Sequence, residues 1–333
     1  FPSVVHMLTG HPFDTTVPID TWFQESWEGE TSKYFYQTLN DNGYKFHFFD
    51  SNNDYFGIQY AEPYVENLRK LTRTDYTVHY DRLVGSMLKL AAYRYAPHML
   101  KQALEPDTFD FYSAVPLNGG EVESCLNRNA FYNRLVRDGL HSIQGDGKYF
   151  IIEFLKGTHP PYHLDADGQL ADNPTLEETA AGYMKVFAEY LEALKRQGVY
   201  DKSTIILTSD HGDKENSMQV MYFIKEPYVR RDEMAVSSAP ISHKEMLGTI
   251  LKNIGVESDL PTIYDFADGE LRERTVMRNY IDTKYPYVPK YHSTAVGTHT
   301  VMYAYTYTGD RRDLRKQFRR GPTEILPLTE SFN

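Results

Sequence analysis

Asp210 and His211 are the two neighbouring side chains of this sequence best suited to bind one metal ion together. They stand in Thr208-Ser209-Asp210-His211-Gly212, directly after an apolar run that is typical of a buried strand. A carboxylate and a neutral imidazole on a turn tightened by glycine can both reach a single divalent cation. Asp and His are also ordinary turn residues, so a purely structural turn remains the alternative. The position at the end of a strand favours the metal site.

His159 occupies the same relative place after a second apolar run. It lies in Thr158-His159-Pro160-Pro161-Tyr162, just past residues 148–155. The pKa of histidine lies near neutrality, so a histidine held between such neighbours can contact an anionic ester or protonate a leaving group. The alternative is a loop histidine that is hydrogen-bonded to the backbone. The sequence leaves both interpretations open.

Asn52 and Asn53 follow the end of a third apolar run, residues 44–49. Amides at a strand end can contact a substrate, and we treat both residues as candidate substrate-binding residues. A turn explains the segment Asp50-Ser51-Asn52-Asn53-Asp54 equally well, because Asn, Asp and Ser are common turn formers.

Helical patterns alternate with the apolar runs and would position these residues. The strongest helix pattern covers residues 176–197, with a capping box at Thr175-Leu176-Glu177-Glu178 and Gly198 at its end. Further patterns predict helices near residues 34–42, 82–93, 97–103 and 130–143, and strands at residues 44–49, 148–155, 203–208 and 220–224. We therefore predict an α/β fold with a mostly parallel central sheet flanked by helices. The strand at 148–155 is expected to be buried on both faces.

The C-terminal part of the chain has a different pattern. Residues 272–308 are rich in Tyr, Thr and Val, and residues 300–307 alternate as an antiparallel strand would. We predict an α/β unit over residues 1–255 and a smaller antiparallel subdomain over residues 256–333. The first residues read as the middle of a structured element, so an N-terminal strand is expected upstream of Phe1.

Composition limits the kinds of partner. The chain has 333 residues, enough for a large core, and 35 basic against 46 acidic residues give a formal charge of -11. This charge argues against nucleic acid as a partner and against a broad electrostatic footprint for an anionic membrane. Cys125 is the only cysteine, so the chain has neither an internal disulfide nor a cysteine-based zinc site.

Several segments together resemble the alkaline phosphatase and sulfatase superfamily, in particular lipoteichoic acid synthase-like sulfatase-domain proteins. Residues 182–212, ending in Thr-Ser-Asp-His-Gly, are similar to the metal-site region of sulfatases, phosphoethanolamine transferases and lipoteichoic acid synthases. The other similar segments are residues 43–53, residues 158–162, residues 222–227, residues 239–245 and residues 249–255. The resemblance covers most of residues 1–255, and Asp-His-Gly in its context is its most specific part.

The resemblance also implies where the nucleophile lies. In this superfamily a Thr, a Ser or a formylglycine precedes a Pro-Ser segment that leads to Leu-Thr-Gly, and Pro2-Ser3 and Leu8-Thr9-Gly10 match that frame. The nucleophile is therefore expected immediately before Phe1. Formylglycine sulfatases resemble Cys-x-Pro-Ser-Arg, and Val4 stands at the position of that Arg. This departure favours a Thr or Ser nucleophile and phosphoryl chemistry.

The function implied by the resemblance is a metal-dependent phosphotransferase or phosphodiesterase acting on cell-envelope phosphate esters, including lipid-linked ones. Asp210 and His211 would hold one divalent ion (Mn, Mg, Zn or Ca), and His159 would bind the phosphoryl group or assist the leaving alcohol. The resemblance further implies an extracytoplasmic domain of a membrane-anchored bacterial protein, with membrane contact only through segments absent from this chain. Two alternatives remain: a sulfatase, and a catalytically inactive ectodomain that binds lipid or protein.

Overall fold

A computed structural model describes most of the chain, and the account that follows concerns its described residues. These are residues 2–14, 17–50, 56–68, 73–104, 111, 113–116, 118, 135, 147–155, 157–160, 162, 164–212, 220–281, 288–291, 294–296, 299–307 and 319–327. Asn52, Asn53 and nearly all of the helix predicted at 130–143 lie outside them.

The N-terminal part builds one side of an α/β arrangement. It contains helices α1 (Pro2–Thr9), α2 (Ile19–Trp27) and α3 (Glu30–Asp41), followed by strand β1 (Tyr44–Asp50). Strand β1 pairs in parallel with β2 (Lys148–Phe154), with Tyr44 opposite Lys148. Both strands and the helix near residues 34–42 agree with the sequence prediction. A parallel pair that is so far apart in the chain requires a long crossover connection.

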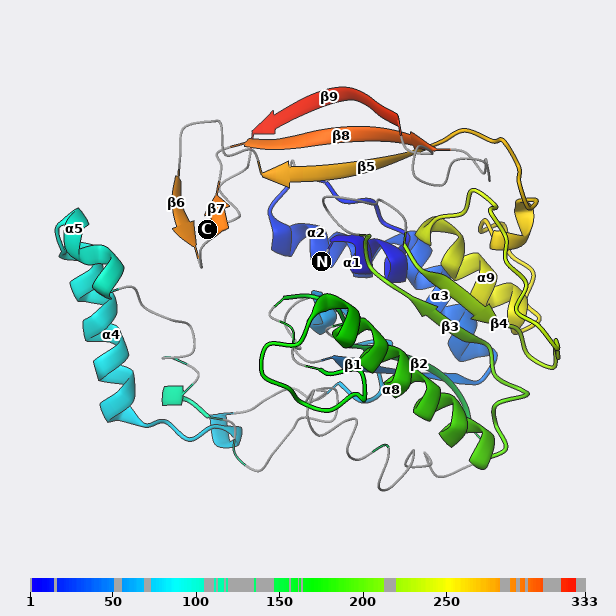
Figure 1. Cartoon of the computed structure of the whole chain (residues 1–333), viewed down its shortest axis with the longest axis horizontal. Coiled ribbons are helices and arrows are strands. Elements are labelled where there is room, and N and C mark those ends of the chain that lie inside the picture. Colours follow the sequence, from blue (N-terminus) through cyan, green and yellow to red (C-terminus); the bar gives the residue numbers. More distant parts are fainter. Residues whose placement is uncertain are drawn as a thin grey trace.

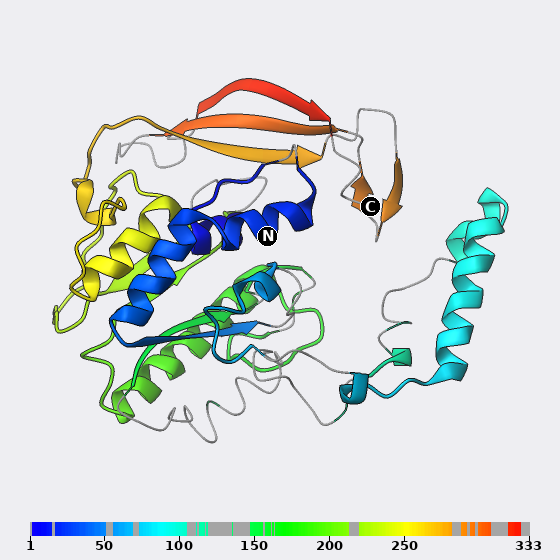
Figure 2. The same ribbon diagram turned by 180° about the vertical axis from the view of Figure 1, so that it is seen from behind.

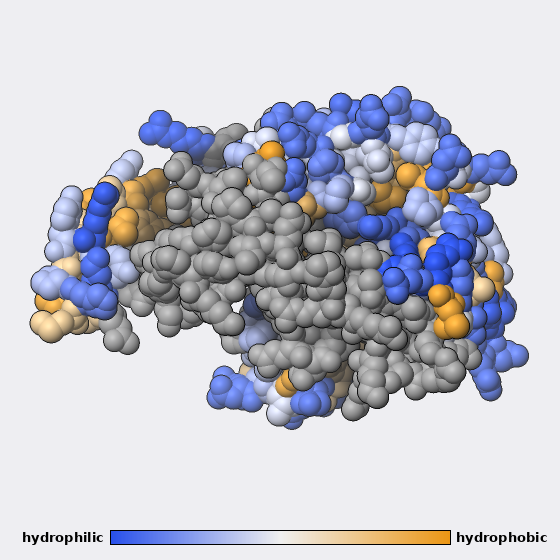
Figure 3. Space-filling view, turned by 90° about the horizontal axis from the view of Figure 1, so that it is seen from above, coloured by the Kyte–Doolittle hydropathy of each residue, from blue (hydrophilic) through white to orange (hydrophobic). Residues whose placement is uncertain are grey.

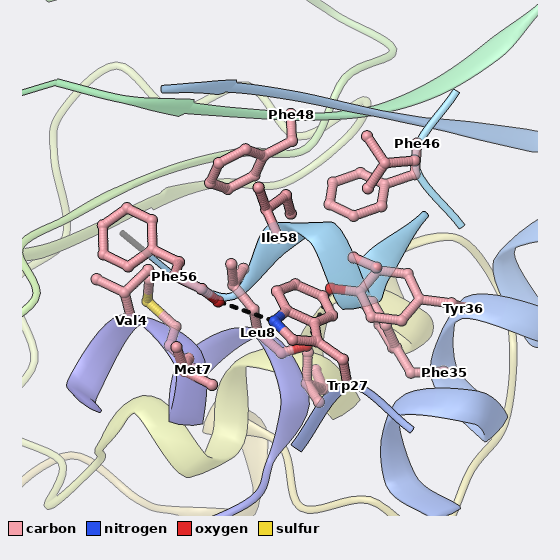
Figure 4. Close-up of a cluster of buried hydrophobic side chains, with 14 of the residues drawn as sticks. Val4, Met7, Leu8, Trp27, Phe35, Tyr36, Phe46, Phe48, Phe56 and Ile58 are labelled. Atoms are coloured by element: carbon pink, nitrogen blue, oxygen red, sulfur yellow. Dashed lines mark hydrogen bonds between the residues drawn. The ribbon is translucent and has the colours of Figure 1, made fainter. Parts of the chain in front are cut away.

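An aromatic core joins these helices to one face of the strands (Figure 4). Its buried members include Val4, Leu8, Trp22, Trp27, Phe35, Tyr36, Phe46, Phe48, Phe56 and Ile58. The polar ends of its large rings are satisfied, because Trp27 Nε1 donates to the Phe56 carbonyl at 2.9 Å and the Tyr36 hydroxyl donates to the Leu8 carbonyl at 3.0 Å. This core fixes the short helix α1 against β1.

Helix α8 (Leu176–Arg196) covers the other side of β2 (Figures 1 and 2). It begins with the predicted capping box: Glu178 N donates to Thr175 Oγ1 at 3.1 Å, and Thr175 N donates to Glu178 Oε2 at 2.8 Å. Val186, Ala193 and Tyr190 form a second, smaller apolar cluster with Leu155. Ile151 of β2 remains 36% exposed, so the prediction that this strand is buried on both faces is wrong among the described residues. The covering on this side is a single described helix.

Two further strands and a helix complete the α/β part. Strand β3 (Ile205–Thr208) pairs antiparallel with β4 (Tyr222–Lys225), and α9 (Met246–Asn253) follows. Ile206 of β3 packs against the aromatic core. The predicted α/β class is confirmed; in the part of the α/β region that the structure describes, one strand pair is parallel and one is antiparallel.

The C-terminal strands are antiparallel, as the sequence predicts. β5 (Arg274–Ile281), β8 (His299–Tyr307) and β9 (Arg319–Pro327) form a sheet in the order β5-β8-β9, and β6 (Val288–Tyr291) pairs with β7 (Thr294–Val296). The three-stranded sheet lies on the side of α1 and α2 that is away from β1 (Figures 1 and 2). The boundary between residues 255 and 256 stays a prediction.

Helices α4 (Tyr80–Tyr95) and α5 (His98–Lys101) stand apart from this body (Figures 1 and 2). They agree with the helices predicted at 82–93 and 97–103. The remaining helical turns are short 3₁₀ segments, namely Ile58–Ala61, Arg73–Asp75, Gln102–Leu104, His243–Glu245 and Ile263–Asp265. Within the described residues, no helix combines the length and the hydropathy that a bilayer crossing requires.

Candidate metal centre

The backbone after β3 presents Asp210 at the edge of the strand pair. Thr208 Oγ1 donates to the Met221 carbonyl at 2.8 Å, and Ser209 N donates to the same carbonyl at 3.4 Å. These bonds extend the pairing with β4 past the last residue of the strand. The turn that follows therefore starts from a fixed position.

The side chains of Asp210 and His211 converge. Asp210 Oδ2 lies 3.7 Å from His211 Nε2, and His211 N donates to Asp210 Oδ1 at 3.0 Å. His211 Nδ1 lies 2.7 Å from the Gly212 carbonyl, which can only accept a hydrogen bond. Nδ1 therefore carries the proton of the neutral ring, and Nε2 keeps its lone pair. Orientation of a ligand histidine by a backbone carbonyl is common in metal sites.

This pair fits two ligands of one divalent ion. Bonds of about 2.0–2.2 Å at a tetrahedral angle place two ligand atoms about 3.4 Å apart, close to the observed separation of Oδ2 and Nε2. Both side chains are accessible, with 28% of Asp210 and 45% of His211 exposed. The described residues contain no group of three or more His, Cys, Asp or Glu side chains that could hold a metal. Among the described residues, this site therefore offers two candidate ligands, Asp210 and His211.

His243 is a neighbour of this turn to which the sequence analysis assigned no role. Its Nε2 lies 3.3 Å from Thr208 Oγ1, and its ring also hydrogen-bonds the backbone of Ser209. Burial lowers the pKa of His243, and the bond to Ser209 opposes part of that decrease. The only sequence signal was membership of residues 239–245 in a segment similar to the superfamily. Contact with a residue 35 positions earlier is visible only in the fold.

A buried ion pair holds His243 in place. Glu245 accepts hydrogen bonds from Ser242 N at 2.6 Å and from Arg274 Nη2 at 2.7 Å, and only 1% of the Glu245 side chain is exposed. Arg274, the first residue of β5, also donates to the Pro240 carbonyl at 2.9 Å. The turn that carries His243 is therefore tied to the C-terminal sheet. Helix α1 packs against the same turn, and the charges of Lys244 and Glu245 act on His6.

The segment Leu8-Thr9-Gly10 has a structural role in the fold. Leu8 and Thr9 are buried at the end of α1, and Thr9 Oγ1 donates to the Val5 carbonyl at 2.7 Å. Gly10 has φ 71°, and a Cβ atom there would lie 2.9 Å from Thr31 Cγ2. Only glycine suits both constraints. The helix begins at Pro2, which is a favoured position for proline.

His159 lies in an exposed loop after β2. Its Nδ1 is 2.6 Å from the carbonyl of Pro160, so its ring is held by the backbone, as the alternative for this residue predicts. The same contact places the proton on Nδ1 and leaves Nε2 unprotonated in the neutral ring. Among the described residues, no hydrogen bond or ion pair joins His159 to Asp210 or His211. The structure brings the two metal candidates together and shows no direct bond from either of them to His159 among the described residues.

Glu153 is a second titratable residue on β2. Burial raises the pKa of Glu153 to about 7, and a hydrogen bond from Tyr190 of α8 opposes part of that increase. Burial likewise raises the pKa of Tyr190. Near neutral pH this carboxyl group is therefore divided between its charged and neutral forms. It faces α8, beside the smaller apolar cluster.

Comparison with known proteins gives structural matches only. No protein-family model and no curated protein sequence matches the chain. Among solved structures it is similar to a protein in the alkaline phosphatase superfamily from Vibrio parahaemolyticus, at a TM-score of 0.48 and 11% identity over 99% of this chain and 71% of that one. It is also similar to the lipoteichoic acid synthase LtaP from Listeria monocytogenes, at a TM-score of 0.46 and 11% identity over 96% and 74% of the two chains.

A third similar structure is Ps i-CgsB in complex with k-i-k-neocarrahexaose, at a TM-score of 0.46 and 14% identity over 98% of this chain and 74% of that one. At these identities and TM-scores, the likeness concerns general architecture and assigns no role to any residue of this chain. The motifs of residues 1–255 resemble the alkaline phosphatase superfamily and lipoteichoic acid synthases, and two of these structures carry the same names.

Proposed function

We propose that this chain is a metal-dependent phosphotransferase or phosphodiesterase domain that acts on cell-envelope phosphate esters. The observation that carries the proposal is the convergence of Asp210 Oδ2 and His211 Nε2 at the end of β3. An extracytoplasmic location and lipid-linked substrates belong to the proposal and follow from the motif resemblance.

Asp210 and His211 would hold the ion, and the Gly212 carbonyl would keep the histidine in the tautomer that binds through Nε2. A bound divalent ion supplies positive charge that neutralises a nonbridging ester oxygen and lowers the pKa of a hydroxyl nucleophile. His243 and the β4 backbone would keep the turn from moving away from the ester.

His159 would contact the phosphoryl group or protonate the leaving alcohol. Its exposed ring can take a proton at Nε2 while Nδ1 remains bonded to the Pro160 carbonyl. The Thr or Ser nucleophile expected just before Phe1 would attack phosphorus and break the bond to the leaving alcohol. The phosphoryl group would then pass to water or to a second alcohol.

Metal binding can be tested with the chain itself. Titration calorimetry with Mn²⁺ and Zn²⁺ should show one site in the wild type and a loss of affinity of at least about 100-fold in Asp210→Ala, because a direct ligand is removed. Asp232→Ala removes an equally charged but exposed carboxylate elsewhere and should bind as the wild type does. Unchanged metal affinity in Asp210→Ala would remove the basis of the proposal.

The chemistry can be tested on a form extended to include the expected nucleophile. Turnover of bis-p-nitrophenyl phosphate, with no turnover of p-nitrophenyl sulfate, would support phosphoryl transfer, and the opposite preference would support a sulfatase. His159→Ala should reduce turnover by about 10²-fold or more. A protein that binds no metal and turns over neither ester would support the inactive, lipid- or protein-binding ectodomain.

A further inference from the structure

The chain on either side of His159 is attached to one face of α8. Before His159, Leu155 packs against the apolar cluster that contains Val186 of the helix. After it, the Leu164 carbonyl accepts a hydrogen bond from Thr179 Oγ1 at 2.9 Å, and only 1% of Thr179 is exposed. Thr179 and Val186 are seven residues apart in the helix, so they lie on the same face.

These two attachments close the base of the loop that carries His159. They meet α8 at points about 10 Å apart along its axis, because the helix rises about 1.5 Å per residue. Eight residues separate Leu155 from Leu164, and an extended segment of that length would reach about 26 Å. The segment therefore bulges out as a loop beside the start of α8 (Figure 1), and His159 is its fourth residue. Loops with ends this close frequently carry functional residues.

The turn that follows the loop is held by its own hydrogen bonds. Asp165 Oδ1 accepts from the backbone N of Asp167 and of Gln169, each at 2.9 Å, and Asp165 N donates to the Gln169 carbonyl at 2.9 Å. Leu164 and Leu170 form an antiparallel bridge across the base of the turn. The turn therefore has a defined shape of its own, and it can serve as a single anchor.

Gly182 allows this turn to approach α8. A Cβ atom on Gly182 would overlap the Asp165 carbonyl oxygen and would lie 3.2 Å from Leu164 Cβ. Carbon and oxygen atoms of neighbouring segments normally lie at least about 3.3 Å apart, so a side chain at this position would push the turn away by roughly 1 Å. Glycine inside a helix lowers its stability, and here it stands where the turn contacts the helix backbone.

An ion pair adds a third contact between the turn and the helix. Lys185 Nζ lies 2.7 Å from Asp167 Oδ1, with side chains 42% and 76% exposed. Hydrophilic side chains make up most of the described surface seen in Figure 3, and exposed pairs of this kind contribute little. The buried contacts at Thr179 and Gly182 therefore determine how closely the turn approaches α8.

We infer that Gly182 is a positioning residue for the reaction, because it seats the turn on α8 and so determines where the loop presents His159. The inference rests on the proposed role of His159 in phosphoryl transfer. The His159 ring itself is exposed and keeps its hydrogen bond within the loop, so α8 holds the base of the loop and leaves the ring accessible to a substrate. A displacement of about 1 Å can lower turnover by up to about 10²-fold.

Turnover of bis-p-nitrophenyl phosphate by the form extended to include the nucleophile tests the inference. Gly182→Ala should lower kcat by about 10-fold and leave the affinity for Mn²⁺ unchanged, because the metal candidates follow β3. Alanine is a better helix former than glycine, so a weaker helix would not explain the loss. Ala181→Ser adds one atom at the exposed neighbouring position and should keep the wild-type kcat.

A double variant separates positioning from a general structural role. His159→Ala with Gly182→Ala should turn over as slowly as His159→Ala alone, because the placement of a missing imidazole no longer matters. A further loss in the double variant would overturn the inference, as would a wild-type kcat in Gly182→Ala.

Thr179→Val provides a second variant if Gly182→Ala does not fold, which circular dichroism shows. It keeps the shape of the side chain, removes the hydrogen bond to the Leu164 carbonyl and should lower kcat without changing the affinity for Mn²⁺. A wild-type kcat in this variant would count against the inference. No turnover by the wild-type chain, or wild-type turnover by His159→Ala, would instead remove the proposed role of His159 and the inference with it.

Discussion

The turn after β3 and the loop after β2 end two strands of the same α/β part, yet they hold their histidines differently. Around Asp210 and His211, the Thr208 hydroxyl donates to the Met221 carbonyl just before β4, His243 lies against Thr208, and a buried ion pair fixes the turn that carries His243. Around His159, the described structure shows one hydrogen-bond contact, from Nδ1 to the carbonyl of the next residue. The first site is supported from three segments of the chain and the second only from within its own loop.

This difference indicates two kinds of task. A metal site needs ligands that are held in position before the ion arrives, because misplaced ligands lose affinity. A proton donor that completes its contacts when substrate binds can lie in an exposed loop. Four substitutions should separate the two tasks, in order of decreasing effect.

Removing the buried ion pair should cause the largest loss. Glu245→Ala leaves Arg274 without its carboxylate partner at a site where Arg274 is 16% and Glu245 1% exposed, so unfolding free energy should fall by about 3–5 kcal/mol. Denaturant unfolding measures this. The matched control is Arg230→Ala, which breaks an exposed pair with Asp201 and should cost less than about 1 kcal/mol. Equal losses in the two variants would contradict the claim that the turn is specifically supported.

His243→Ala should weaken metal binding while Asp210 and His211 stay intact. The loss of the contacts with Thr208 and Ser209 releases the turn, and affinity for Mn²⁺ or Zn²⁺ should fall by about 10–100-fold. Titration calorimetry gives the affinity, and His243→Asn, which keeps a side-chain donor, should recover part of it. If His243→Ala binds metal as tightly as the wild type, the turn does not need this support.

Glu153→Gln should remove a pH dependence that belongs to the β2 side. The folded-state pKa of Glu153 is raised to about 7 from 4.5, so ionisation costs more in the folded than in the unfolded chain, and stability declines as pH rises through that range. At pH 8 the variant should be more stable than the wild type by about 1–3 kcal/mol, and at pH 4 the gain should vanish.

Urea unfolding at the two pH values measures the effect. Glu192→Gln replaces an exposed glutamate of α8, one that pairs with Lys195, and should change stability little at either pH. A gain at pH 8 that persists at pH 4 would show that the carboxyl charge of Glu153 is not its cause.

His159→Ala should have the smallest effect on the folded protein. The side chain is exposed and its one described contact is local, so unfolding free energy should change by no more than about 0.5 kcal/mol and metal affinity should not change. Denaturant unfolding and metal titration check both. A drop in metal affinity of 10-fold or more would place His159 among the ligands and cancel the contrast with Asp210.

The sequence predicted the elements whose signals are local. The capping box at Thr175 and Glu178, the glycine at 198 and the apolar runs of β1, β2 and β3 depend on neighbours in the chain, and all appear in the fold. The turn at Asp210 and His211 was also predictable from its neighbours in the chain, because it follows an apolar run and is closed by Gly212. The direction in which neighbouring strands pair was less predictable. The antiparallel pairing of β3 with β4 depends on contacts outside each strand's own sequence.

The support around the site could not be predicted from local patterns. His243 reaches Thr208 across 35 residues, and Arg274 reaches Glu245 across 29. The exposure of Ile151 likewise depends on which helices cover β2. Such contacts have no periodicity or motif in the chain, and only packing determines them.

The most direct test of the central claim is anomalous diffraction from crystals of this chain soaked in Mn²⁺ or Zn²⁺. The proposal predicts an anomalous peak about 2.0–2.2 Å from both Asp210 Oδ2 and His211 Nε2, with the His211 Nδ1 still bonded to the Gly212 carbonyl. Crystals that bind the ion elsewhere and leave these two atoms without it would contradict the account.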